Sequence, residues 1–275
     1  MPDRLLTEAV LESARDLDRR STADVLRAVH DQDAVALRAV EAVLPHIEHA
    51  VDVLVLALQG GGRWFNVGAG TSGRLGVADA AEVPPTFGYP ADRVIGLIAG
   101  GPRAMMGAVE GAEDDPEAAR AALRDRDLVP GDAVVALSAS GRTPYAVAAL
   151  EEAHSVGARR IAICCDPASP LATMAEVAIA PVVGPEIIAG STRMKGGLAQ
   201  KMVLHLLSTT VMVRLGRVEG NLMTNLHPAS RKLRRRAVEI VMSLAKVERE
   251  RAECLIEEAH GSVHDALARA RNEKR

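Results

Sequence analysis

Aromatic residues, net charge and long apolar runs are all scarce in this sequence, and each shortage excludes a class of protein. Phe, Trp and Tyr make up 2% of the 275 residues, so a core must consist of aliphatic side chains. No stretch approaches the roughly 18 apolar residues that cross a membrane, and the charged N-terminus lacks the apolar centre of a signal peptide. The net charge of −3 gives no electrostatic reason to expect nucleic acid. We therefore expect a cytoplasmic protein that partners neither a membrane nor a nucleic acid.

Cysteine is scarce as well. The three cysteines, of which Cys164 and Cys165 are adjacent, do not form a disulfide framework and lack the spacing of zinc ligands. Free cysteines usually pack as small hydrophobic side chains. We therefore interpret them as buried thiols and expect no metal site.

What the sequence does contain is a central part in which strand-like and helical patterns alternate. Five short apolar runs are separated by Ala-rich helical patterns, at 63–70, 93–101, 132–141, 159–166 and 177–184. Strands that are apolar throughout and alternate with helices are typical of a parallel sheet covered on both faces. We therefore expect an α/β fold, a three-layer αβα sandwich around a five-stranded parallel sheet.

The flanking parts are helical. Residues 8–60 have apolar residues at three- and four-residue spacing, with Ser21 and Thr22 as possible caps of the first helix. Residues 198–216 predict a long apolar helix buried against the sheet, and the tail predicts two or three helices. The expected parts are an N-terminal helical segment at 1–50, the α/β domain at 51–228 and a C-terminal helical subdomain at 229–275.

The tail also carries a cluster of basic residues: Arg231, Lys232, Arg234, Arg235 and Arg236. Such a cluster is either a site for a phosphate or a partner or, more simply, a solvated helix face.

Three glycines after the first apolar run, Gly68, Gly70 and Gly73, have the G-x-G-x-x-G spacing of a dinucleotide-binding turn. That site also needs an acidic residue at the end of the second strand, and the sequence there is LIAGGP. A P-loop is excluded too, because Arg74 and Leu75 stand where Lys and Ser or Thr are required. We therefore expect neither a nucleotide nor another cofactor.

Hydroxyl side chains point to a different ligand. Thr71 and Ser72 lie within the glycine motif, where a helix begins. The turn after the third strand contains Ser138, Ser140, Arg142 and Thr143, and a later polar stretch contains Ser191, Thr192, Arg193 and Lys195. Hydroxyls together with the free N–H groups of a helix N-terminus bind phosphate well. Ordinary helix caps are the alternative, but two such turns at strand ends favour a site for one phosphate monoester.

Longer motifs carry a family resemblance. LSASGRTPY resembles the phosphate loop of sugar isomerase (SIS) domains, which bind phosphosugars without metal or nucleotide. GAGTSGRLGVADAAEVPPTFG, GLIAGG, AVEGAEDD and GSTRMKGGLAQKMVLHLLSTTVMVRLGRVEGNLM together resemble the N-acetylmuramic acid 6-phosphate etherase family, over about residues 21–233. The glucokinase regulatory protein of animals shares parts of these motifs in a longer chain. Ser230 and the pair Thr224 and Asn225 depart from the family, which usually has Asn and Val-Asp there.

The resemblance implies a reaction. The family cleaves the lactyl ether at C3 of N-acetylmuramic acid 6-phosphate and releases N-acetylglucosamine 6-phosphate and D-lactate, as a cytoplasmic homodimer in peptidoglycan recycling. A base removes the C2 proton of the open-chain aldehyde, an acid assists the departure of lactate, and water adds at C3. By motif position Glu113 resembles the base and Glu82 the acid. Residue type alone makes Glu113 one member of an acidic loop and Glu82 a solvated carboxylate.

Two other functions fit the same fold, a phosphosugar sensor without turnover and an aldose-ketose isomerase. The presence of both Glu82 and Glu113 favours the enzyme, because a sensor needs neither. If the helix after Gly73 extends to Glu82, it spans roughly 15 Å at 1.5 Å per residue, longer than a hexose phosphate. Glu82 is therefore predicted to serve the site of a neighbouring subunit.

Overall fold

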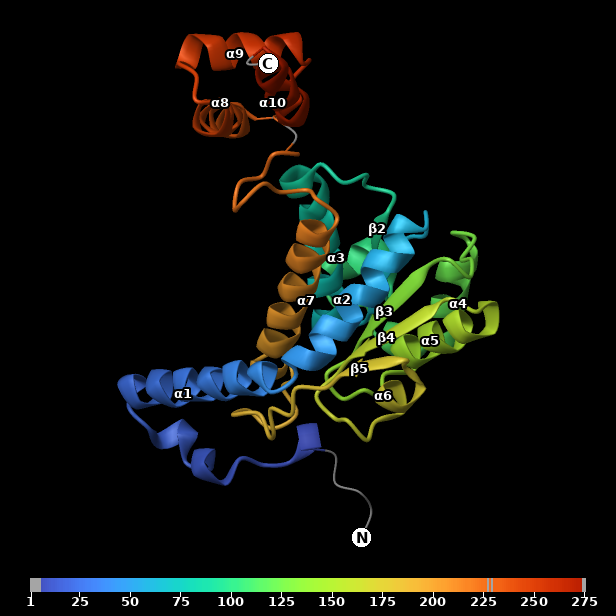
Figure 1. The fold of residues 1–275 in the computed structure, drawn as a ribbon. Helices are drawn as coiled ribbons and strands as arrows, with labels where there is room; N and C mark the ends of the chain where they lie inside the picture. The colour runs from blue at the N-terminus through green and yellow to red at the C-terminus, as the bar shows by residue number, and fades with distance from the viewer. Residues whose placement is uncertain (1–5, 227, 229, 274–275) are drawn as a thin grey trace.

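A computed structural model describes residues 6–226, 228 and 230–273. Its centre is a sheet of five parallel strands in the order β2-β1-β3-β4-β5 (Figure 1). The strands are β1 (Trp64–Gly68), β2 (Val94–Ile98), β3 (Ala133–Leu137), β4 (Arg159–Ile163) and β5 (Val177–Ile179). The expected five-stranded parallel sheet is confirmed, and each strand lies within its predicted apolar run.

Helices cover both faces of the sheet, because alternate strand residues point to opposite sides. Trp64 of β1 and Val135 of β3 belong to one core, which includes residues of α2 (Leu44–Gln59), α3 (Gly70–Phe87) and α7 (Lys195–Arg214). Phe65 and Val134, each one residue away along its strand, belong to the other core, with α4 (Pro116–Arg124), α5 (Pro144–Val156) and α6 (Pro170–Met174). The three-layer sandwich is therefore confirmed.

The N-terminal part differs from its prediction before residue 22. Three short 3₁₀ turns, η1 (Leu6–Glu8), η2 (Glu12–Ala14) and η3 (Leu17–Arg19), stand where a helix was expected from residue 8. The first long helix, α1 (Thr22–Glu41), begins at the expected cap, since the Ser21 hydroxyl accepts a hydrogen bond from the Asp24 N–H at 3.2 Å. The turns η2 and η3 share a cavity with residues 187–189 instead.

Helix α7 is largely buried, as expected, and shares one hydrophobic core with the sheet. The helices α1, α2 and α3 also pack against it. Cys164 and Cys165 are buried at the end of β4, as predicted. Cys254 is exposed, so the prediction of buried thiols is wrong for this residue, which lies on the outer face of a C-terminal helix.

Three helices form the C-terminal part, α8 (Arg231–Ala245), α9 (Arg249–Glu258) and α10 (Val263–Asn272), and they share a separate small core. They lie at one end of the molecule, beyond the C-terminal end of α7 (Figure 1). Ser230 caps α8 by accepting a hydrogen bond from the Leu233 N–H at 3.2 Å, a role that Asn performs equally well. The departure from the family at this position is therefore conservative.

The segment between α7 and α8 contacts the end of α3. Gly88 follows α3 with φ of +58°, and a Cβ atom there would lie 1.9 Å from the Asn225 carbonyl oxygen. The expected boundary at residue 50 falls inside α2. Residues 1, 229 and 275, which bound two of the expected parts, lie outside the described residues.

Candidate active site

The chain changes direction across the sheet between β1 and β3, and this arrangement opens a crevice at their carboxyl ends. After β1 the chain passes through α3 to β2 on one side, and then returns to β3 on the other side of β1. Helix α3 covers one face of the sheet, whereas α5, which follows β3, covers the opposite face. Such a switch point is where ligands bind in open α/β sheets.

The glycine motif owes its spacing to close packing of α3 on the sheet. A Cβ atom on Gly73 would lie 2.5 Å from the Gly68 carbonyl oxygen and 2.7 Å from the Ile98 side chain. A Cβ atom on Gly68 would lie 2.9 Å from the Leu137 carbonyl oxygen of β3. Close packing of strand and helix therefore accounts for Gly68 and Gly73, the first and last glycines of the motif.

Helix α3 begins at the crevice with free donors. Its N-cap, Ala69, has no side chain that could accept from the first turn, so the N–H groups of Thr71 and Ser72 lack an intrahelical partner. Both residues line the crevice. The Ser72 hydroxyl donates a hydrogen bond to Gln200 Oε1 of α7 at 2.8 Å.

The turn after β3 gathers its hydroxyls into one network. Ser138 Oγ lies 2.8 Å from Thr143 Oγ1 and 3.3 Å from Ser140 Oγ, and it accepts a hydrogen bond from the Gly141 N–H at 3.1 Å. Thr143 is the N-cap residue of α5, yet its side chain makes no capping hydrogen bond. Thr143 is therefore not an ordinary cap. All three hydroxyl residues line one cavity, where they contact one another and backbone N–H groups of the turn.

These two turns and a third segment, 190–193, enclose one cavity of about 500 Å³, which we call the strand-end pocket. Its lining includes most of the predicted binding residues: Thr71, Ser72, Ser138, Ser140, Arg142, Thr143, Ser191 and Thr192. Arg193 lines it as well, and Arg142 is held beside it by Asp166, with 3.4 Å between Nη2 and Oδ2. Hydroxyls, helix N-termini and two guanidinium groups suit an anion such as a phosphate.

Carboxylates occupy other parts of the same pocket. Glu113, the predicted base, lies on the 3₁₀ turn η5 (Ala112–Asp114) and lines the pocket together with Asp114. Glu8 of η1 lines it too, and its Oε2 would lie 2.9 Å from a Cβ atom on Gly190. Sequence reasoning missed Glu8, because nothing in its local pattern places the N-terminal turns over the end of the sheet.

Glu82 and Lys195 do not line the strand-end pocket. Glu82 is exposed on α3, ten residues after Ser72, which corresponds to about 15 Å along a helix. Lys195 is only 2% exposed, because its side chain turns inward and Nζ donates to Gln32 Oε1 of α1 at 2.6 Å. Its burial lowers its pKa.

Buried acidic groups brace the helices around the pocket. Glu186 is 1% exposed and accepts hydrogen bonds from the backbone N–H groups of Lys195 at 3.2 Å and Gly196 at 2.8 Å, so it caps the first turn of α7. Asp79 of α3 accepts from Ser208 of α7 at 3.3 Å. Burial raises the pKa of both carboxyl groups.

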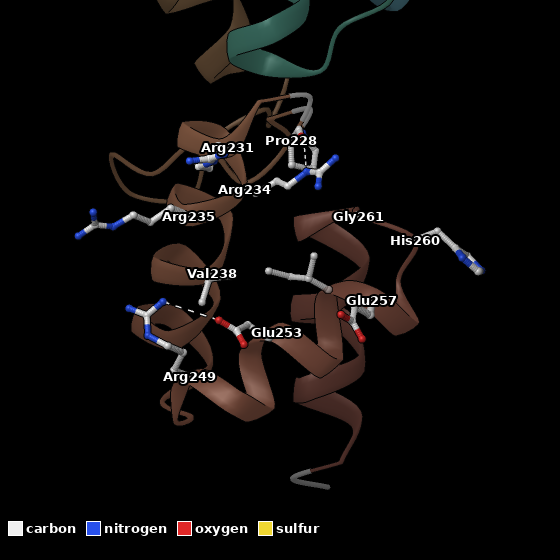
Figure 2. Close-up of a pocket in the computed structure, with 11 residues that line it drawn as sticks. Pro228, Arg231, Arg234, Arg235, Val238, Arg249, Glu253, Glu257, His260 and Gly261 are labelled. Atoms are coloured by element: carbon white, nitrogen blue, oxygen red, sulfur yellow. Dashed lines mark hydrogen bonds and ion pairs between the residues drawn. The ribbon is translucent and has the colours of Figure 1, made fainter.

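A second cavity, of about 800 Å³, lies in the C-terminal part, and we call it the C-terminal groove. Figure 2 shows Val238 of α8 facing its centre, with Arg231 and Arg234 along the α8 side. Arg249 and Glu253 are paired within it, with 3.8 Å between Nη1 and Oε1. Arg231, Arg234 and Arg235 of the basic cluster therefore line this groove, and no member of the cluster lines the strand-end pocket.

Two kinds of feature are absent from the described residues. They include no group of three or more His, Cys, Asp or Glu side chains placed to hold a metal ion. No helix in the described part of the chain is both long enough and apolar enough to cross a membrane.

The part of the sequence that forms the sheet matches two family models of SIS domains. Residues 46–154 match the family model of the glucokinase regulatory protein N-terminal SIS domain, and residues 117–210 match that of the SIS domain. Among solved structures, a phosphoheptose isomerase of Neisseria gonorrhoeae superposes with a TM-score of 0.53 at 17% identity, over 70% of this chain and 98% of that one. An Escherichia coli protein, solved in complex with a ligand, superposes at 0.54 with 18% identity, over 74% and 97%. The fold is therefore the SIS fold.

Much higher identity links the chain to bacterial enzymes. It is 51% identical over 265 residues to an N-acetylmuramic acid 6-phosphate etherase of Symbiobacterium thermophilum, a match that covers 96% of this chain and 88% of that relative. An enzyme of the same name from Mesorhizobium japonicum is 48% identical, over 96% and 86% of the two chains.

Proposed function

The chain belongs to the N-acetylmuramic acid 6-phosphate etherase family, and from this premise we propose that its strand-end pocket binds the substrate phosphate beside Glu113 as base. The protein is a carbon–oxygen lyase of peptidoglycan amino-sugar recycling, which converts its substrate and water into N-acetylglucosamine 6-phosphate and D-lactate. One observation carries the proposal. Hydroxyls from two strand-to-helix turns line a single pocket that also holds a predicted catalytic carboxylate.

The phosphate is held without metal by the α3 and α5 turns. Ser138, Ser140 and Thr143 supply hydroxyl donors, and the first turn of α3 supplies the Ser72 hydroxyl and free N–H groups. Arg142 adds a positive charge. Ser191 and Thr192 approach from the segment before α7. Lys195 holds α1 against α7 and does not bind the substrate in this proposal, since its ammonium group is buried against Gln32 of α1. Turnover is expected to survive EDTA.

The reaction proceeds by elimination and then hydration. In the open-chain aldehyde the C2 proton is acidic, and the Glu113 carboxylate takes it as the C3–O bond breaks. The leaving lactate oxygen takes a proton from Glu82, and a water molecule then adds to C3 of the unsaturated intermediate. In ¹⁸O-water the label is expected in the sugar product. Label in lactate alone means cleavage of the lactyl C–O bond and overturns the elimination.

A second subunit brings Glu82 to the pocket. Glu82 lies about 15 Å from the α3 turn of its own chain, too far to share one hexose with it. A homodimer is favoured by large apolar side chains that face solvent in the single chain: Leu26 and Leu37 on α1 are 66% and 62% exposed, and Leu56 on α2 is 65% exposed. Leu26 and Leu37 are eleven residues apart and so lie on one side of α1.

Mixing variants tests the shared site. Chains with Glu82→Ala and chains with Ser140→Ala are each expected to be impaired, and heterodimers are expected to regain activity at the one site with both intact groups. Activity no greater than the sum of the separate homodimers contradicts the sharing of sites. Gel filtration of each variant provides the control for assembly.

Lactate release from the purified protein separates the possible functions. An isomerase converts an aldose phosphate into a ketose phosphate without releasing lactate, and a sensor binds without turnover. The family membership does not favour either of these. In the cell we propose a cytoplasmic enzyme, with residues 51–228 as the catalytic domain flanked by the helical parts at 1–50 and 229–275.

A further inference from the structure

Gln200 lies behind the strand-end pocket, where it contacts the Ser72 hydroxyl. It belongs to α7 and is fully buried, at 0% exposure. Helices α7 and α3 pack closely here. A Cβ atom on Gly197 of α7, one turn before Gln200, would lie 3.4 Å from the methyl group of Thr71 on α3. In the structure Ser72 Oγ donates its proton to Gln200 Oε1 at 2.8 Å. Gln200 Nε2 is buried without a hydrogen-bond partner among the described residues.

This hydrogen bond conflicts with phosphate binding. A serine hydroxyl has one proton to donate, and a phosphate dianion offers only acceptors. While Ser72 donates to Gln200, its oxygen presents lone pairs to the pocket and repels the phosphate oxygens. The Ser72 proton must therefore leave Gln200 before the hydroxyl can bind the ligand.

The Gln200 amide has the means to release this proton. Rotation of the amide by 180° exchanges Oε1 and Nε2 at nearly the same positions. Nε2 then donates to Ser72 Oγ, and the hydroxyl proton turns toward the pocket. Each orientation leaves one amide atom of Gln200 without a partner, so the exchange costs little by itself. A phosphate in the pocket favours the second orientation, because only that one supplies a donor.

We infer that Gln200 is a positioning residue whose amide rotates when the phosphosugar binds and thereby makes Ser72 a donor to the phosphate. The inference rests on the proposed phosphate site. It assigns a role to a side chain that has no atom in the pocket lining.

Two substitutions of similar length separate this role from a purely structural one. Gln200→Glu supplies only acceptors in its ionised form, so it holds the Ser72 proton once the carboxyl group is ionised. Because burial raises the pKa of such a group, binding is measured at pH 7 and at pH 9, and the effect is judged at the higher pH. Gln200→Met neither accepts nor donates, so it leaves the proton free. Calorimetric binding of N-acetylglucosamine 6-phosphate is expected to weaken at least tenfold in Gln200→Glu and less than about threefold in Gln200→Met. N-acetylglucosamine without phosphate provides the control ligand.

Ser72→Ala distinguishes the failure of this inference from the failure of the proposed site. If Ser72→Ala binds as tightly as the unaltered protein, Ser72 does not hold the phosphate and that part of the proposed function is wrong. If Ser72→Ala weakens binding but Gln200→Glu does not, the inference alone is wrong. In the double variant, Gln200→Glu is expected to add less than twofold to the effect of Ser72→Ala. A full tenfold addition shows that the buried charge acts independently of Ser72.

A spectroscopic measurement on the unaltered protein tests the inference even if Gln200→Glu does not fold. The side-chain NH₂ resonances of Gln200, assigned by their loss in Gln200→Met or Gln200→Leu, are expected to shift when N-acetylglucosamine 6-phosphate is added. The same resonances are expected to stay in place in Ser72→Ala at saturating ligand. Resonances that do not move in the unaltered protein contradict the amide rotation.

Discussion

The strand-end pocket and the C-terminal groove differ in size and in what their polar groups contact. The groove is the larger, at about 800 Å³ against about 500 Å³. Two of its arginines are paired with carboxylates of the same region, Arg249 with Glu253 at 3.8 Å and Arg235 with Glu239 at 3.0 Å. In the strand-end pocket the hydroxyls after β3 contact one another and the N–H groups of their own turn, and the pocket lies between two helix N-termini. The convergence of hydroxyls and helix N-termini, more than cavity size, therefore identifies the site.

The largest loss of activity is expected from substitution of Glu113, which lines the strand-end pocket and not the groove. Glu113→Gln is expected to lower kcat by about 10²- to 10⁴-fold, because the amide cannot take the C2 proton. Exchange of that proton with deuterated water, followed by NMR, is expected to cease in the variant. Glu82→Gln is the matched control, since it lacks only the acid and is expected to keep the exchange while releasing no lactate. The opposite pattern reverses the two roles.

Binding of the phosphate is the next effect in size. Ser140→Ala removes one hydroxyl of the network after β3 and is expected to cost about 1–3 kcal/mol of binding, as for hydrogen bonds to charged groups. That corresponds to an increase in KM of about 5- to 150-fold with a smaller change in kcat. An unchanged KM contradicts the assignment of phosphate binding to the strand-end pocket. Calorimetry with the product phosphosugar measures the same loss without turnover.

Glu186 caps the first turn of α7, directly after the segment 190–193 that lines the strand-end pocket. Glu186→Ala leaves the buried N–H groups of Lys195 and Gly196 without their acceptors, and we expect a loss of about 2 kcal/mol in the free energy of unfolding. Glu186→Gln keeps an acceptor for only one of these two N–H groups, so we expect it to cost about 1 kcal/mol, less than Glu186→Ala. Urea unfolding measures both. Equal losses indicate that the charge of Glu186, and not the cap, carries the effect.

The smallest effect is expected in the C-terminal groove. Arg231→Ala and Arg234→Ala alter its basic side but leave the strand-end pocket intact, so kcat and KM for lactate release are expected to change less than twofold. Arg142→Ala, in the pocket, is the matched control and is expected to raise KM. A hundredfold loss in either groove variant places part of the active site in the C-terminal helices.

The sequence predicted the features that local chemistry determines. Each strand was found because a buried parallel strand is apolar throughout, as β3 is. The hydroxyl turns were brought to one pocket because carboxyl ends of neighbouring parallel strands meet at the same edge of the sheet. The start of α1 at Ser21 was found because a cap is a local signal.

What the sequence did not predict depends on tertiary contacts. Lys195 stands in a polar stretch, but its position on the first turn of α7 directs it toward Gln32 of α1, 163 positions earlier in the chain. Residues 8–20 carry a helical pattern, yet their apolar side chains follow the surface formed by residues 187–189. Neither contact leaves a signal within a short window of sequence.

The scarcity of aromatic residues has a practical consequence for measurement. Trp64, the only tryptophan, is fully buried at the start of β1, where its Nε1–H donates to Asn66 Oδ1 at 2.7 Å. Residues 230–275 contain no aromatic side chain. Tryptophan fluorescence therefore reports on the sheet alone, whereas far-ultraviolet circular dichroism reports on all helices. A single sample observed by both methods shows whether the C-terminal helices melt with the sheet or separately from it.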